Sequence, residues 1–381
     1  MRLRIDPRIA AVGFLLNVSS FLAWTVIPVW SRYEAVAPAW QQGMLPLFSG
    51  VTYILVALRA GAHSDRMSRV GLARAGMVLF AVFCALAWWI RSVPAIAALA
   101  VINGFGMALI WPAIQARIAD DATAEDLERR MGEFSLSWSA GKTTGFLCFA
   151  LVYRKLGLGF DTLLLCGGLS LLVSLLLPRP SDGHGPARAP LVRDDLHPPE
   201  VRAAHLRAGW IANFAAYGLG STVVYLYPDL LADRGRPPEH QGIVLGTLYA
   251  AQTFGFWLFG RFSGWRYRLG PLLAWMAAGC GALLALGFGA PLSLGVPAAA
   301  VLGLALGQAY SASVYYSVHS EESRGARAGV HEAVIGASDF AFPLIGGFAA
   351  FATGRTEAPY VAAALISALA MTFAVTSTRR R

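Results

Sequence analysis

The sequence predicts an all-α integral membrane protein whose twelve transmembrane helices form two pseudo-symmetric six-helix bundles. Three observations support this fold class. Hydrophobic residues make up 56% of the 381 residues and charged residues only 14%, whereas a soluble domain usually carries about 25% charge. Twelve apolar stretches come close to the roughly 20 residues that cross the hydrocarbon core of a bilayer. Finally, residues recur along the chain at a fixed offset of 199.

The twelve expected helices follow one another closely, so no soluble domain of useful size remains between them. Several are interrupted by Gly, Pro, Ser or Asn. A bundle tolerates such breaks because neighbouring helices and cavity water satisfy the freed backbone groups. The stretches expected to span the membrane are 9–31, 40–60, 71–91, 93–116, 132–153, 160–178, 207–228, 241–262, 270–290, 293–317, 329–353 and 357–377.

The repeat relates the first six spans to the last six. A constant offset over such a length indicates duplication of one multi-helix unit. Two parallel halves with the substrate site at their interface are a known transporter design. The matching positions are Gln42-Gly43 with Gln241-Gly242, Gly61 with Gly260, Arg69 with Arg268, Gly71 with Gly270, Gly104 with Gly303, Glu133 with Glu332 and Ser139 with Ser338.

Basic residues set the expected orientation. The net charge is +9, but the arginines gather at both termini and in alternate loops, such as those at Arg66 and Arg69 and at Arg129 and Arg130. The positive-inside rule places the termini and these loops in the cytoplasm and requires an even number of spans. Topology therefore explains the positive charge, and we expect no nucleic-acid partner.

One segment has the composition of a linker. Residues 179–206 are rich in Pro, Arg and His and cannot bury an apolar face, so we expect a flexible cytoplasmic connector. The domain boundaries follow from it. Residues 1–178 form the N-terminal six-helix bundle and residues 207–381 form the C-terminal one.

The loop after the second expected span carries a recognisable motif. It reads Gly61-Ala-His-Ser-Asp65-Arg66-Met-Ser-Arg69. This resembles the loop between helices two and three of the major facilitator superfamily, commonly G-x-L-A-D-R-x-G-R-[RK]. His63 and Ser68 depart from the usual Leu and Gly.

The second half carries a weaker copy of the motif. It keeps Gly260, Arg266 and Arg268 but has Gly264 where the acid of the motif should stand. Span count, linker and repeat extend the resemblance over the whole chain. It implies the twelve-helix major facilitator fold in the cell membrane and leaves the subfamily open.

The resemblance also implies a gate on the cytoplasmic side. Asp65 would contact the N-terminus of the expected helix that starts near Gly329, where unpaired N–H groups and the helix dipole favour a carboxylate. This contact would hold the cytoplasmic side closed and break when the halves rock. The alternative is that Asp65 and Arg66 are only stop-transfer charges.

Two further acids stand at the starts of expected helices. Glu133 and Glu332 could act as first-turn acids on a helix dipole, pair with loop arginines, or remain solvated at the interface. The residues expected to serve gating are Gly61, Asp65, Arg66, Arg69, Glu133, Arg266, Arg268 and Glu332.

Two charges are expected to lie deep in the membrane. Lys142 follows Glu133 by nine residues, about 13 Å along a helix, and Asp339 follows Glu332 by seven, about 10 Å. A charge at the bilayer centre costs at least about 2.5–3.5 kcal/mol, so it normally faces a cavity or a partner. We therefore expect both to face a central cavity, with Lys142 attracting an anionic group of the solute and Asp339 binding a proton or cation. The alternatives are a structural ion pair and a Lys142 side chain that snorkels to the interface.

Other candidates for solute or ion contact are polar and aromatic residues in the spans 9–31, 93–116, 207–228 and 293–317, which the resemblance implies line the pathway. Buried amides need partners, so several should face water or solute, although hydrogen bonding between helices is an equally good explanation for any one of them. They are Asn17, Trp24, Asn103, Trp111, Gln115, Asn213, Tyr217, Gln308 and Tyr310.

Two local patterns weigh against other mechanisms. Gly141-Lys142-Thr143 looks like the end of a nucleotide-binding P-loop, but Leu136 stands where the first glycine is required and the surroundings indicate a membrane helix. The exporters of the superfamily place a Gly-Pro pair in the fifth helix, where this chain has Gly145-Phe146. This departure weighs against a drug/proton antiporter.

The expected function is secondary active transport of a small organic solute by alternating access, coupled to a proton or cation gradient. We expect a monomer in the cell membrane with both termini cytoplasmic, and neither a cofactor nor a metal. The main alternative is a non-transporting sensor or assembly factor on the same fold. An enzyme is not expected, because no His/Glu metal pair or nucleophile–base constellation occurs in the spans. ATP-driven transport lacks a nucleotide motif.

Overall fold

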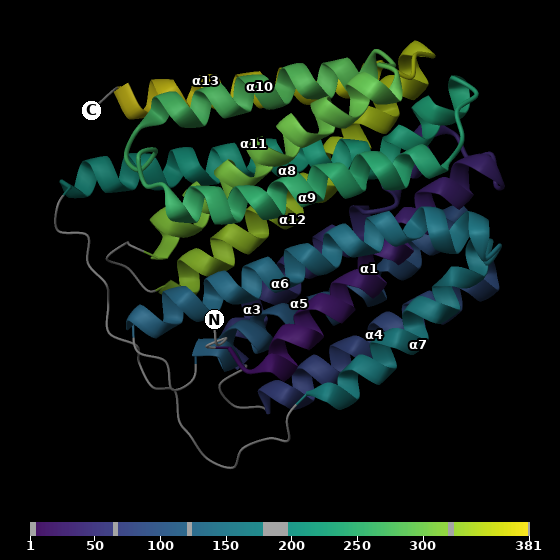
Figure 1. Cartoon of the computed structure of the whole chain (residues 1–381), viewed down its shortest axis with the longest axis horizontal. Helices are drawn as coiled ribbons and strands as arrows, with labels where there is room; N and C mark the ends of the chain where they lie inside the picture. The colour runs from purple at the N-terminus through teal and green to yellow at the C-terminus, as the bar shows by residue number, and fades with distance from the viewer. Residues whose placement is uncertain (1–4, 64–67, 120–123, 178–196, 319–323, 380–381) are drawn as a thin grey trace.

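The computed structural model describes residues 5–63, 68–119, 124–177, 197–318 and 324–379, and all long elements in these ranges are helices (Figure 1). The first half contains α1 (Pro7–Tyr33), α2 (Ala39–Met44), α3 (Leu47–His63), α4 (Arg69–Ile90), α5 (Val93–Ala119), α6 (Ala124–Ala150) and α7 (Thr162–Leu176). The second contains α8 (Pro199–Asp233), α9 (Glu239–Arg261), α10 (Leu269–Gly287), α11 (Leu292–Val318), α12 (Arg324–Thr353) and α13 (Ala358–Arg379).

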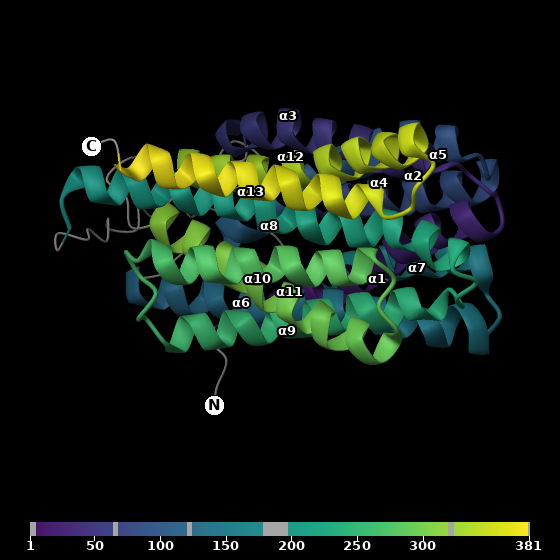
Figure 2. The same ribbon diagram turned by 90° about the horizontal axis from the view of Figure 1, so that it is seen from above.

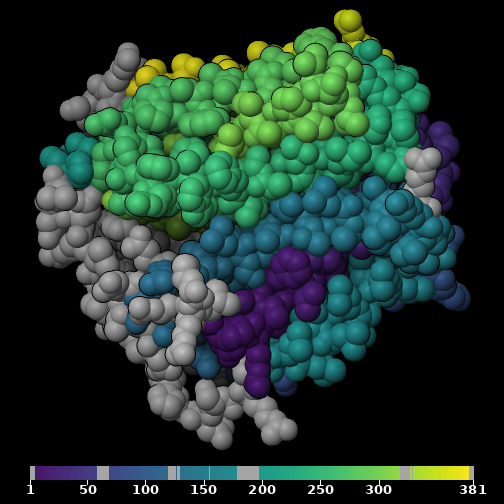
Figure 3. Space-filling model, in the orientation of Figure 1, coloured from purple at the N-terminus to yellow at the C-terminus, as the bar shows by residue number. Residues whose placement is uncertain are grey.

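The two halves lie side by side with their helices along a common axis (Figures 1 and 2). Figure 3 shows the second half, in green, packed along the first, in purple and blue. The start of α1 and the end of α13 lie toward the same end of the bundle, called the termini end below. The opposite end, where α1 and α8 finish, is called the far end.

The repeat in the sequence is a repeat of helices. Shifting α5 by the 199-residue offset gives 292–318, the bounds of α11. Gly104 of α5 lies directly against the backbone of Ser49 in α3, and Gly303 of α11 lies in the same way against the backbone of Leu248 in α9. Each pair is separated from the other by the same offset, so both halves use the same glycine crossing. Helices α2 and α3 together occupy the expected span 40–60, so the thirteen α-helices of the described residues correspond to twelve spans. The twelve-helix fold in two related bundles is thereby confirmed.

The outside of the bundle suits a bilayer. Nine of the described helices are long and apolar enough to cross a membrane. Large apolar side chains are exposed on their outer faces, such as Leu175, Leu369 and Phe373, as expected for contact with lipid. The remaining three long helices are α3, which has 17 residues, and the more polar α6 and α8.

The linker is shorter than predicted. Helix α8 begins at Pro199, inside the range 179–206 that we expected to be flexible. Pro at the first helical position and Glu200 in the first turn are favourable helix-start residues, and they override the polar composition of the segment. His205 of this extension packs against Tyr267 and Tyr316. Residues 178–196 lie outside the described part of the chain.

The glycine crossing makes a stability prediction. Gly303→Ala would place a methyl group against the Leu248 carbonyl oxygen. Overpacking of this kind typically costs about 1–3 kcal/mol, so we expect a lower midpoint of thermal unfolding for the purified protein. Gly281→Ala is the matched control, because nothing lies within 4 Å of the added carbon. Equal midpoints for the two variants would contradict the crossing.

Candidate functional site

A cavity of about 230 Å³ lies between the two halves. Its wall is formed by α1, α3, α5 and α6 of the first half and by α8, α9, α11 and α12 of the second. The predicted candidates on this wall are Lys142, Asp339, Asn17, Trp24, Asn103, Trp111, Gln115, Tyr217 and Tyr310. The structure therefore brings together residues that are far apart in the sequence.

Two predicted candidates do not line the cavity. Asn213 and Gln308 are buried within the second half, and their side-chain amides have no hydrogen-bond partner among the described residues. Gln308 lies two residues before Tyr310, about 200° around the helix, so the two side chains cannot share one face. Contact of Asn213 or Gln308 with a solute in this cavity is not supported.

The cavity amides partly serve helix packing. Asn17 Nδ2 donates to the Gly13 carbonyl oxygen at 2.7 Å, and Asn103 Nδ2 donates to Ser49 Oγ at 2.8 Å. The second bond joins α5 to α3. Hydrogen bonding between helices and cavity lining, which the sequence left as alternatives, thus occur together at Asn103.

Lys142 lies among aromatic rings rather than beside an acid. Its Nζ is 3.8 Å from the ring centroid of Tyr249, 4.2 Å from that of Phe21 and 5.8 Å from that of Tyr217. Phe146 stacks on Tyr249 with centroids 4.9 Å apart, which fixes one wall of this box. Attraction between an ammonium and ring faces can reach about 2 kcal/mol when desolvated. The rings therefore hold the charge in place without neutralising it.

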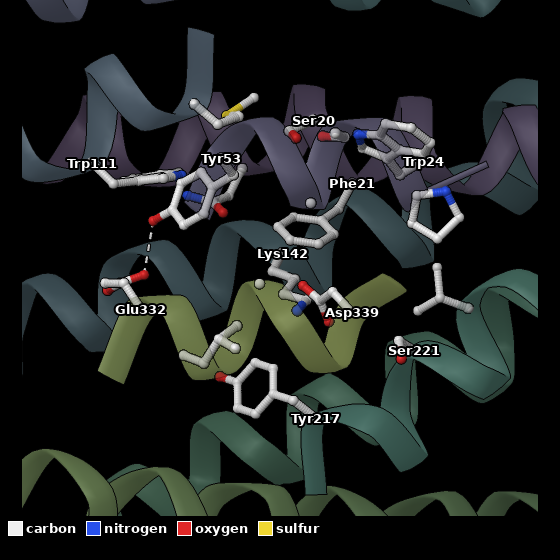
Figure 4. Close-up of a pocket in the computed structure, with 18 of the residues that line it drawn as sticks. Ser20, Phe21, Trp24, Tyr53, Trp111, Lys142, Tyr217, Ser221, Glu332 and Asp339 are labelled. Carbon is white, nitrogen blue, oxygen red and sulfur yellow. Dashed lines mark hydrogen bonds between the residues drawn. The ribbon is translucent and has the colours of Figure 1, made fainter. Parts of the chain in front are cut away.

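Asp339 faces the same cavity from α12 (Figure 4). The two opposite charges attract each other electrostatically. No hydrogen bond, and no ion pair within 4.0 Å, joins Asp339 to Lys142 or to any other described residue. Lys142 and Asp339 therefore do not form the structural ion pair that the sequence left as an alternative.

Glu332 corrects one of our predictions. Helix α12 begins at Arg324, not near Gly329, so Glu332 lies more than two turns inside the helix and is no first-turn acid. It lines the cavity, where it accepts from Tyr53 Oη at 2.8 Å and from Gln115 Nε2 at 3.3 Å (Figure 4). These bonds connect the second half to α3 and α5 of the first.

Glu133 is also well inside its helix, because α6 begins at Ala124. Its Oε2 accepts from the Ile5 amide at 3.0 Å, and its Oε1 lies 3.6 Å from Arg129 Nε. Both early helix starts have one cause. The polar residues before each apolar run still form helix, whereas hydropathy marks only the membrane-length part.

The other gating candidates are scattered over the termini end. Arg69 Nη1 donates to the Ala116 carbonyl oxygen at 3.1 Å, and Arg266 stacks over the Tyr315 ring at 4.4 Å. Arg268 is exposed just before α10, and Gly61 lies in the last turn of α3. Asp65 and Arg66 lie outside the described residues, so the implied gate stays a prediction.

Sequence reasoning missed the contacts that join the halves at the far end. Arg32 Nε of α1 lies 2.6 Å from Asp229 Oδ1 of α8, and Tyr33 Oη donates to the Arg236 carbonyl oxygen at 2.7 Å. The backbone of Gly43 lies directly against that of Gly347. No signal in the sequence marked Arg32 beyond its being one of the few basic residues in the arginine-poor loops.

It also missed most of the aromatic wall. Phe21, Tyr53, Phe134, Trp138, Tyr225 and Tyr249 line the cavity in addition to the predicted aromatic residues. Trp138 was the one within reach of sequence reasoning, since it precedes Lys142 by four residues and therefore shares its helix face.

Comparison with known proteins agrees with this architecture. The model of the Major Facilitator Superfamily matches residues 9–316. Similar solved structures include a bacterial homolog of the human lysosomal transporter Spinster in an inward-facing and occupied conformation. The two chains are 17% identical, with a TM-score of 0.71, and the alignment covers 97% of this chain and 96% of that one. The nucleoside transporter NupG has 14% identity, a TM-score of 0.73 and full coverage of both chains. The human organic anion transporter TETRAN has 18% identity, a TM-score of 0.62 and coverages of 97% and 99%.

No match was found among curated proteins. The solved structures are similar in fold at low identity, and the family model covers most of the sequence. The family that the Gly61–Arg69 loop resembles is thereby confirmed. The chain belongs to the major facilitator superfamily and is a multi-pass membrane transporter.

Proposed function

We propose that the protein is a secondary active transporter that moves a small organic solute by alternating access, coupled to a proton or cation gradient. The observation that carries this proposal is the cavity between the halves, with Lys142 and Asp339 on its wall and out of contact with each other. A deep charge costs at least about 2.5–3.5 kcal/mol in a bilayer. Binding of a solute or an ion in the cavity would offset the cost of keeping these two charges apart.

The roles follow from the chemistry of the two groups. Asp339 can take up a proton or bind a cation, and Lys142 can attract an anionic group of the solute. The two residues stand on α12 and α6, one from each half. A movement of the halves would therefore change the distance between the two charges. Binding at one charge would in this way change the affinity of the other for its ligand.

The contacts at the far end support alternating access. An ion pair between Arg32 and Asp229, and the close approach of Gly43 to Gly347, hold the halves together there. With the termini in the cytoplasm, this closed end would face outward. For the solute to cross, these contacts would have to separate while a gate at the termini end, around Asp65, forms.

Transport is tested by accumulation. Proteoliposomes that contain the purified protein are given a pH gradient and a mixture of metabolites, and their contents are measured by mass spectrometry. We expect at least one organic solute to accumulate, and to do so neither in vesicles without protein nor in vesicles with the Lys142→Ala variant. If nothing accumulates, the protein would instead be a sensor or assembly factor that reuses the fold.

The orientation makes a separate prediction. Reporter domains fused at either terminus, or inserted within residues 179–196, should report the cytoplasm, because the arginine-rich loops alternate with arginine-poor ones. A reporter inserted after Val36, an exposed residue at the far end, should report the outside. A linker reporter outside the cell would overturn the topology and the direction of the gates together.

A further inference from the structure

The cavity leaves one cation and one anion without hydrogen-bond partners. The rings of Phe21 and Tyr249 hold the Lys142 ammonium but take none of its N–H donors. Within the described ranges, neither Lys142 nor Asp339 has a hydrogen bond or an ion pair. Polar groups in protein interiors are nearly always satisfied, so both have capacity for a ligand.

Several other polar groups of the cavity have hydrogen-bond partners. The carboxylate of Glu332 accepts from both Tyr53 and Gln115. Asn17 and Asn103 donate to neighbouring groups of the protein at 2.7 and 2.8 Å. Among the described cavity residues, the one buried side-chain atom without a hydrogen-bond partner is Asn103 Oδ1. Lys142 and Asp339 differ from it because they carry full and opposite charges, one from each half, on a wall rich in aromatic rings.

We propose that the solute is a zwitterion with a flat apolar body. Its anionic group would bind Lys142, its cationic group would bind Asp339, and its body would lie among the aromatic rings of the cavity. This inference rests on the proposed function and names its substrate class.

Electrostatic repulsion would strengthen the selection of a zwitterion over solutes with a single charge. A solute with only a negative charge would enter a cavity that holds the carboxylates of Asp339 and Glu332. A solute with only a positive charge would meet the Lys142 ammonium, which forms no ion pair within 4.0 Å with a described acid and therefore keeps its charge facing the cavity. A zwitterion satisfies both free groups and adds no net charge to the membrane interior.

Three compounds that share an indole ring separate the classes. Tryptophan is the zwitterion, tryptamine the cation and indole-3-propionate the anion. Binding to the purified protein is measured by titration calorimetry and by the shift of thermal unfolding. Each relative lacks one of the two charge-assisted hydrogen bonds that tryptophan would form, so tryptophan should bind at least about tenfold more tightly than either of them.

Variants assign each preference to its residue. Lys142→Met should remove the preference for tryptophan over tryptamine, and Lys142→Arg should keep it. Asp339→Asn should remove the preference over indole-3-propionate. Matched controls are Lys155→Met, at an exposed lysine outside the cavity, and Asp161→Asn, which changes an exposed aspartate. Both should bind as the unaltered protein does.

Some outcomes overturn the inference. Tighter binding of tryptamine or indole-3-propionate than of tryptophan, or no binding of any of the three, contradicts a zwitterion site. The proposed function fails in a different way. If singly charged compounds accumulate in proteoliposomes, transport stands and the substrate class is wrong. If nothing accumulates while tryptophan binds as described, the binding site stands and transport is wrong.

Discussion

Asp339→Asn is expected to abolish the accumulation of solute that a pH gradient drives. Movement of the solute down its own concentration gradient should remain measurable. Asparagine keeps the size of the side chain and an acceptor oxygen, but it cannot take up a proton. A gradient of one pH unit is worth about 1.4 kcal/mol per proton, which corresponds to about tenfold accumulation. The variant should reduce this ratio to about one.

The position of Asp339 explains why one residue can have so large an effect. The carboxylate has no hydrogen bond to another described residue and faces the cavity. It can be occupied by one positive charge at a time, either a proton or the cationic group of the solute. Competition for one carboxylate makes release of the first a condition for binding the second, which is the minimum requirement for exchange coupling.

The measurement separates coupling from binding. Uptake into proteoliposomes is followed with and without a pH gradient, at solute concentrations high enough to offset a weaker affinity. Asp161→Asn, which removes an exposed aspartate at the far end, should accumulate solute normally. If Asp339→Asn still accumulates solute about tenfold, the coupling site lies elsewhere, and Glu332 is the next carboxylate of the cavity to test.

The helices were the most predictable part of the structure. The apolar stretch 93–116 became α5 (Val93–Ala119), and its copy at 293–317 became α11 (Leu292–Val318). Membrane length and the repeat determine such elements without knowledge of their neighbours. The errors lie where helices continue beyond the bilayer, at the starts of α6, α8 and α12. Hydropathy locates the part of a helix that lies in the bilayer. It does not locate the residue at which the helical hydrogen bonds begin or end.

The site was predictable only where a residue type was out of place. A lysine and an aspartate in apolar helices are costly, which marked Lys142 and Asp339. Phe21 and Tyr249 gave no such signal, because the chain has 21 Phe and 12 Tyr and most have no charge to hold. Glu332 was placed wrongly because α12 begins at Arg324, and its contacts could not be foreseen because Tyr53 and Gln115 belong to the other half.

The ion pair at the far end was beyond sequence reasoning for a related reason. Arg32 and Asp229 are about 200 positions apart and come together only because α1 and α8 end beside each other. Their side chains are only 25% and 10% exposed, so the contact is poorly screened by solvent. In the proposed alternating-access mechanism such a pair would differ from a surface salt bridge, because it would exist in one conformation and break in the other.

Asp229→Asn is therefore expected to open the far end. The substitution leaves the Arg32 guanidinium without its counter-charge, and breaking a buried pair in this way is strongly destabilising. Under the proposed mechanism the cost would fall on the closed arrangement alone, because the two groups would already be separated in the open one. We expect the open population to rise at least about tenfold, which corresponds to about 1.4 kcal/mol.

Distances between spin labels at the far end would measure this shift. Trp89 and Phe288 are exposed, 77% and 62%, and they are equivalent positions of the two halves under the 199-residue offset. Cysteines at these two sites, in a variant without the native ones, should report a longer distance when Asp229 is neutralised. Glu357→Gln is the matched control, because its partner Arg234 belongs to the same half and their contact does not cross the interface.

A charge-exchange variant distinguishes loss of the Arg32–Asp229 ion pair from a folding defect. Exchanging the charges by combining Arg32→Asp with Asp229→Arg should restore the short distance, since the attraction is retained with its direction reversed. A damaged fold would not be repaired by a second charge change. If the distance between the labels is the same in the unaltered protein and in Asp229→Asn, the pair does not hold the far end closed. The close backbone contact of Gly43 with Gly347 would then be the better candidate for that role.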